Sequence, residues 1–295
     1  MSGMDPALAA HLESGLTTLA RAWALTRADG VEMGFTDHDR PLSFEGITFR
    51  PDTGLSAMAL QQGTGLAVDN TEALGALSDA AITEADIEAG RYDGAELRVW
   101  LVNWAEPEAR HLAFRGHIGE IRRIDGAFRA EVRGLSDALN RPLGRVFQRP
   151  CTAVLGDSAC RFDLDTPGYF HEGPVEAVEG ARVFRLPALA GFAPGWFARG
   201  RLRVLDGPAA GLAGAIKRDL SEDGARVIEL WEPLRAAVAP GARLRLEAGC
   251  DKRMETCRLK FDNLLNFRGF PDIPEEDWVL VHAGQSGSLG GGSRR

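Results

Sequence analysis

The sequence predicts a mainly β protein of the β-rich α+β class. We expect two sandwich-like or barrel-like β domains, short helices and a loop-rich C-terminal region held by cysteines. Three observations support this class. Apolar and polar residues alternate with a period of two in many short segments. The 295 residues include 35 glycines and 15 prolines, which favour turns. Acidic-Gly pairs stand between alternating segments, as in β-hairpins.

The N-terminal third is predicted to begin with a short helix and to continue as strands. Asp5 followed by Pro6 is a good N-cap and first-turn pair for a helix over about 5–16. Alternation over 19–27 then predicts a strand. Hairpin turns are predicted where an acidic residue precedes glycine, at residues 29–30, 45–46 and 125–126.

The rest of the chain repeats the strand pattern after one helical interval. Residues 66–90 have helical composition, with Ser78 and Thr83 as candidate caps. Strands are predicted around 95–104 and 111–124, and then in the second half at 181–189, 199–207, 213–220, 225–231 and 242–249. We predict an N-terminal domain over 1–150, a second domain over 151–275 and a flexible tail of linker composition over 276–295.

Composition excludes several classes of function. The formal net charge is −8 and basic residues are scattered, so the chain lacks the basic stripe that binds nucleic-acid backbones. No apolar run approaches the roughly 20 residues needed to span a bilayer. The N-terminal residues carry acids where a signal peptide has positive charge, so we expect synthesis in the cytoplasm. Thiols stay reduced in that compartment.

Four cysteines form the strongest candidate site. Cys151 and Cys160 are separated by eight residues, and Cys250 and Cys257 by six. Four thiolates can hold a zinc ion or an iron–sulfur cluster. Zinc sites usually pair cysteines two to four residues apart, so the wider spacing favours a cluster held by loops. Two disulfides, Cys151–Cys160 and Cys250–Cys257, or four unrelated buried thiols are the alternatives that remain open.

Enzymatic motifs are weak. Asp37, His38 and Asp39 could form an acid–base group, but alternate residues of a strand face opposite sides, which would separate His38 from both carboxylates. His117 is predicted to be a sheet histidine. The chain contains no GxSxG or HExxH motif and no dinucleotide-binding fingerprint. We therefore expect no enzymatic activity.

Four stretches carry a family resemblance: GFTDHDRPLSFEG, RGHIGEIRR, FQRPCTAVLGDSACRFD and GCDKRMETCRLKFDNLLNFRGFPDIP. The chain resembles the baseplate hub, or tail-tip hub, proteins of long-tailed phages and phage-derived gene transfer agents over about residues 16–275. Glu275 departs from the pattern, where a glycine is expected. That difference concerns a loop exit and not the cysteines.

The resemblance implies a structural function. Hub proteins of this kind form a homotrimeric ring at the distal end of the tail, adapt the sixfold tube to a threefold tip and leave a channel through which DNA passes without specific binding. The implied partners are the distal tail protein and tip or fibre proteins, and the implied location is the virion baseplate after assembly in the cytoplasm. The related lambda-type tail-tip proteins carry an iron–sulfur cluster. This implies that Cys151, Cys160, Cys250 and Cys257 hold one, of the 4Fe–4S type.

Two other functions compete with this expectation. A soluble iron–sulfur redox protein would use the same four cysteines, although four thiolate ligands leave no open position for a substrate. A zinc-stabilised binding module would need only one ion in their place.

Overall fold

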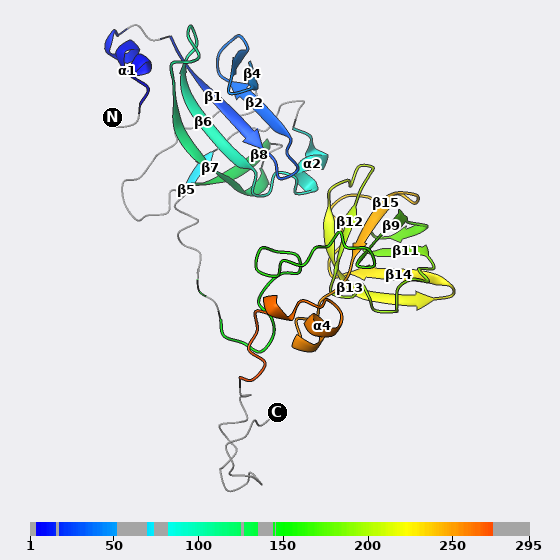
Figure 1. The fold of residues 1–295 in the computed structure, drawn as a ribbon. Coiled ribbons are helices and arrows are strands. Elements are labelled where there is room, and N and C mark those ends of the chain that lie inside the picture. The colour runs from blue at the N-terminus through cyan, green and yellow to red at the C-terminus, as the bar shows by residue number, and fades with distance from the viewer. Residues whose placement is uncertain are drawn as a thin grey trace, which may run out of the picture. The chain divides into compact units, whose positions relative to one another are not determined.

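The computed structural model describes residues 4–15, 18–51, 70–73, 82–124, 127–134, 144 and 146–273. The chain divides into two compact units, Met1–Pro142 and Leu143–Arg295. Each unit contains one large sheet, which confirms the predicted mainly β class (Figure 1). The predicted tail 276–295, the Ser78 cap and the turn at 125–126 lie outside the described residues. No helix in the described part is long and apolar enough to cross a membrane.

The first unit is an eight-stranded sheet with the strand order β3-β4-β2-β1-β6-β7-β8-β5. Only the β2–β4 pair is parallel among its strand pairs within the described ranges. The strands, in chain order, are β1 Leu19–Thr26, β2 Glu32–Thr36, β3 Leu42–Phe44, β4 Ile47–Pro51, β5 Asn70–Ala73, β6 Glu96–Asn103, β7 Arg110–Ile124 and β8 Ala127–Gly134.

Two short helices of the first unit follow the predicted capping. Helix α1, Pro6–Glu13, begins after Asp5, whose carboxylate accepts the N–H groups of the first turn. Helix α2, Glu84–Glu88, begins after Thr83, whose hydroxyl accepts the N–H of Asp86. Such caps satisfy N–H groups that have no partner within the helix.

Both faces of β1 are buried, which explains its alternation of large and small apolar residues. Trp23 and Leu25 belong to one core cluster, whereas the three alanines of the strand belong to another. The second cluster is dominated by Phe44, Phe49 and Trp100, with ring centroids 4.2 to 5.7 Å apart. The small alanine side chains leave room for these rings against the sheet.

The second unit is a seven-stranded antiparallel sheet with the order β10-β11-β14-β13-β12-β15-β9. Its two outermost strands, β9 and β10, follow each other along the chain with two residues between them, so the sheet curls and brings its edges together. The strands are β9 Phe170–Pro174, β10 Ala177–Glu179, β11 Val183–Pro187, β12 Arg201–Val204, β13 Ala213–Glu222, β14 Ala225–Leu230 and β15 Arg243–Glu247.

Strand β13 makes the curl possible because it changes partners along its length. Its first residues, 213–215, pair with β12, and residues from Ile216 onward pair with β14. The register shifts between Ile216 and Arg218, which is where a bulge bends a strand between two sheets. The core inside contains fully buried side chains that include Phe184, Leu202 and Ile228.

Helix α4, Met254–Leu259, and the 3-10 helix η1, Leu264–Asn266, follow the barrel-like sheet. Both lie in the C-terminal region that the sequence predicted to be loop-rich. Strands β9 and β10 were not predicted either.

Candidate metal centre formed by the four cysteines

The two cysteine-bearing segments lie side by side although they are about ninety residues apart in sequence. The N–H of Cys151 donates to the carbonyl of Lys252 at 2.8 Å. The next residue, Thr152, donates from its N–H to the carbonyl of Arg268 at 3.3 Å. The structure therefore brings the entrance of the second unit onto its exit, as the shared-site hypothesis requires.

Cys250 is positioned by the end of β15. The N–H of Gly249 donates to the carbonyl of Trp196 at 2.9 Å. A Cβ on Gly249 would come within 1.6 Å of the carbonyl oxygen of Ala198, so this close approach of two backbones requires glycine. Cys250 follows directly and is therefore anchored to the barrel-like sheet.

Cys257 is presented by helix α4 and is 8% exposed. Its Sγ donates to the carbonyl of Asn263 at 3.2 Å, and the Asn263 N–H donates back to the Cys257 carbonyl at 3.0 Å. The Asn263 side chain donates from Nδ2 to the carbonyl of Cys160 at 2.7 Å and lies 3.5 Å from the Cys160 Sγ. Asn263 thus joins one cysteine of each pair.

Cys160 lies in a turn organised by Asp157. The Asp157 carboxylate accepts the N–H groups of Val154, Ala159 and Cys160 at 2.6 to 2.9 Å. These donors, that of Cys160 first, lower the pKa of Asp157. The turn is therefore held by an ionised carboxylate at neutral pH.

The four thiols share one electrostatic environment. Burial raises the pKa of Cys257 to about 11, and the negative charges of Cys250, Cys151 and Cys160 add to the rise. Burial also raises the pKa of Cys250, with a contribution from Cys151. Ionising Cys250 and Cys257 together would be unfavourable without a positive group beside them, and a bound metal would supply that charge.

Several polar groups contact the cysteine sulfurs. The N–H of Arg268 donates to Cys151 Sγ at 3.3 Å, and the Asn263 amide faces Cys160 Sγ. Lys252 counteracts the rise in the pKa of Cys250. Hydrogen bonds to the sulfurs are one means by which proteins support iron–sulfur clusters. The donor set therefore fits such a cluster.

All four cysteines are free thiols in the structure. In the described ranges, no three His, Cys, Asp or Glu side chains are arranged to hold a single metal ion. The charges of the other three thiols nevertheless contribute to the raised pKa of Cys257, so all four cysteines lie within electrostatic range of that thiol. An iron–sulfur cluster is larger than a single ion and can take its ligands from more widely spaced loops.

Lys260 ties the cysteine region to the sheet and was not anticipated from sequence. Its ammonium donates to the carbonyls of Trp196 and Gly249 at 2.7 and 2.9 Å and lies 4.2 Å from the Trp196 ring centroid. Burial lowers its pKa. The Tyr169 hydroxyl donates to the Lys260 carbonyl at 2.6 Å. Polar residues of this kind give no sequence signal, since their partners come from distant segments.

The predicted geometry of Asp37, His38 and Asp39 is wrong. Residues 37–40 form a bend after β2, not a strand, so His38 Nε2 lies 3.3 Å from the Asp39 carboxylate. The His38 ring also packs on Trp104 with centroids 5.0 Å apart, and Asp37 accepts the N–H of Arg21 at 2.6 Å. These contacts connect the bend to the sheet. His117 lies in β7 and is exposed.

The fold defines a β-rich protein of two units with four free cysteines in the second. The family model described as baseplate hub protein, N-terminal attachment domain, matches residues 5–163, which is more than half of the chain. The chain belongs to this baseplate hub family. A second model, described as phage conserved hypothetical protein BR0599, matches residues 195–277. Each matched range contains one cysteine pair.

The chain is also similar to a chain in a solved structure described as the virion of a native gene transfer agent particle. The two are 59% identical, the match covers 98% of this chain and 99% of that one, and the TM-score is 0.89. The search of curated proteins found no match.

Proposed function

We propose that this protein is a non-enzymatic structural subunit at the tip of a phage-like tail. Three copies would form a ring that adapts the sixfold tube to a threefold tip and lines the channel for DNA. The observation that carries this proposal is the similarity, over almost the full length of both chains, to a chain of a gene transfer agent virion. The baseplate hub family points to the same location.

The net charge of −8 fits a channel component, because DNA is repelled by like charge and binding its phosphates would need a basic stripe. Two β units in each of three copies would give six wall segments, which is one way to match a sixfold neighbour. Neighbours in this arrangement are the distal tail protein on one side and tip or fibre proteins on the other.

The second part of the proposal is a 4Fe–4S cluster held by Cys151, Cys160, Cys250 and Cys257. Its support is that two distant segments of the second unit are hydrogen-bonded to each other beside the cysteines, and that the charges of the other three thiols contribute to the raised pKa of Cys257. When bound, the cluster would act as a cross-link whose binding free energy contributes to folding. The chain's own residues would orient the thiols through Gly249, α4 and Asn263.

Cryo-EM of purified tail particles tests the location. We expect density for this chain at the distal end of the tail, in multiples of three copies. Placement in the tube shaft or in the capsid would refute the hub proposal. Metal analysis of the isolated chain tests the cluster separately, so the two parts can fail independently.

A further inference from the structure

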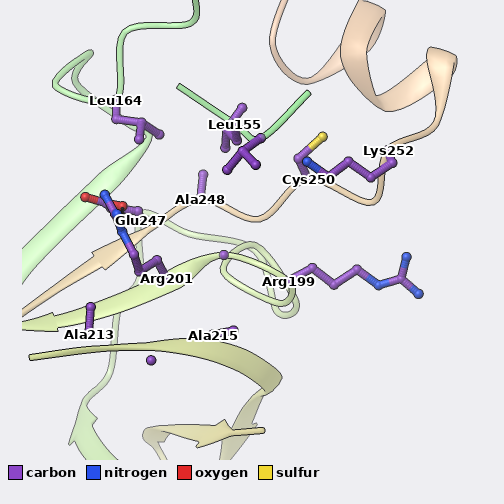
Figure 2. A pocket seen from close by; sticks show the side chains of 13 residues that line it. Leu155, Leu164, Arg199, Arg201, Ala213, Ala215, Glu247, Ala248, Cys250 and Lys252 are labelled. Atoms are coloured by element: carbon purple, nitrogen blue, oxygen red, sulfur yellow. Dashed lines mark hydrogen bonds and ion pairs between the residues drawn. The ribbon is translucent and has the colours of Figure 1, made fainter. Parts of the chain in front are cut away.

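A pocket of about 310 Å³ lies in the second unit beside the cysteine site (Figure 2). Its walls come from β12, from the start of β13, from the end of β15 and from loop residues between 154 and 164. Figure 2 shows Arg199, Cys250 and Lys252 toward one end, and Glu247, Arg201 and Ala213 toward the other. Among the cysteines only Cys250 lines the pocket, so the pocket is separate from the space that the four thiols share.

The charged groups of the pocket leave it positive. Arg199, Arg201 and Lys252 contribute three cations against the single carboxylate of Glu247. That carboxylate is 5% exposed, accepts Arg201 Nε at 2.8 Å and Arg245 Nε at 3.2 Å, and is therefore neutralised within the fold.

The Lys252 ammonium donates to the carbonyl of Ala153. Arg199 lies at the edge of the pocket, and Figure 2 shows its side chain extending outward from the other lining residues. Its side chain is exposed, and no ion pair of its guanidinium occurs within the described ranges. Its backbone has φ 65°, in the left-handed region that arginine rarely adopts, and the Arg199 N–H donates to the carbonyl of Ile216 at 2.9 Å. Within the described ranges, the fold thus holds a cation without an ion pair at the rim, in an unfavourable backbone conformation.

The other lining groups are apolar. Leu155 and Leu164 line the pocket together with Val154, which is 67% exposed. Ala213 and Ala215 are exposed on the same face of β13 and leave space above the strand. A pocket of a few hundred Å³ with apolar walls and a few charged groups has the character of a binding site.

We propose that this pocket binds a peptide segment in which acidic residues adjoin large apolar ones, and that its occupant is residues 275–281 of this protein. That segment reads EEDWVLV, with three acids followed by Trp278 and three aliphatic residues. The acids match the cations of the rim and the apolar residues match the interior. The segment begins two residues after Ile273, where the described part of the cysteine region ends. The inference goes beyond the proposed tail function and does not depend on it.

Site-specific photo-crosslinking of the full chain tests the proposal. Benzoylphenylalanine replaces Ala213 in the pocket or, as a matched control, Ala177, which is exposed on β10 outside the pocket. Mass spectrometry after trypsin digestion identifies the captured peptide. We expect crosslinks from position 213, and not from 177, to the peptide that contains residues 275–281. Mixing unlabelled and ¹⁵N-labelled chains shows whether the crosslinked residues 275–281 belong to the same copy of the protein or to a neighbouring copy.

Charge reversal supplies the second arm of the test. Arg199→Glu should lower the crosslink yield at position 213 about tenfold, the ratio that 1.4 kcal/mol represents. Replacing residues 275–277 by lysine in that same variant should restore the yield. Three results would each overturn the proposal: capture of a different segment of the chain, absence of a specific crosslink, or a crosslink yield that neither charge change alters.

Discussion

Replacing Asp219 by alanine is expected to destabilise the second unit by about 3–5 kcal/mol. Asp219 lies on β13 and its side chain is 0% exposed. The carboxylate accepts Arg226 Nη2 at 2.7 Å and the N–H of Phe197 at 2.8 Å, and it also contacts Arg226 Nε. Removing it leaves a guanidinium with a 2% exposed side chain and no counter-charge. Breaking one side of a buried pair is costly for this reason.

The size of this loss of stability depends on the hydrogen bonds that Arg226 keeps in the variant. Its Nη1 and Nη2 still donate to the carbonyls of Phe192 and Ala193 at 3.0 and 2.6 Å, so the donors stay partly satisfied but the charge does not. Asp219→Asn keeps an acceptor for Phe197 while removing the charge, and should fall between wild type and Asp219→Ala.

Equilibrium urea unfolding of the full chain, under anaerobic conditions, measures the effect. With a slope of about 2 kcal/mol/M, the expected loss moves the midpoint by about 2 M. Hydrogen exchange of peptides within 201–247 assigns the transition to the second unit. The control is Asp165→Ala, which breaks a pair with Arg245 in which Asp165 is 77% exposed and should cost about 0–1 kcal/mol. Equal midpoints for Asp219→Ala and this control would refute the reasoning.

Three further outcomes are expected. Cys160→Ser and Cys257→Ser should each destabilise the second unit strongly and combine with little added loss, because both remove one shared site; additive losses with iron fully retained would exclude that site. His38→Ala should cost about 1 kcal/mol through lost packing and one hydrogen bond, and a hydrolytic activity lost only in this variant would contradict the structural role. Burial lowers the pKa of His171, so its contribution to stability is present above the unfolded-state pKa near 6.5 and is lost as the pH falls through the lower folded-state pKa. Stability measured from pH about 7.5 to 5 should therefore fall less in His171→Phe than in wild type, and parallel curves would contradict this.

Strands could be predicted where apolar and polar residues alternate and the alternating segment ends at turn-forming residues. Residues 19–26 alternate and end before a hairpin turn, and the structure has β1 at Leu19–Thr26. Glu45 and Gly46 both have positive φ, as a two-residue hairpin turn of type I′ requires. Strands β9 and β10 escaped prediction because the sequence FHEGPVEAVE contains Pro174 and little alternation. Their pairing is imposed by the curl of the sheet and not by local preference.

The cysteines could be identified from sequence, but the groups that position them could not. Asp157, Asn263 and Lys260 are ordinary polar residues whose roles depend on hydrogen-bond partners in distant segments. The bend at residues 37–40 shows the opposite error. The alternation of a strand would place His38 and Asp39 on opposite faces. The backbone bends here instead, and His38 contacts the Asp39 carboxylate.

The iron and acid-labile sulfide content of the full chain, purified without oxygen, tests the shared cysteine site most directly. We expect about four irons and about four sulfides per chain, as a 4Fe–4S cluster requires, with the content abolished or sharply reduced in Cys257→Ser. One zinc per chain with no iron, or a metal-free chain that retains four free thiols and full stability, would contradict the cluster assigned to Cys151, Cys160, Cys250 and Cys257.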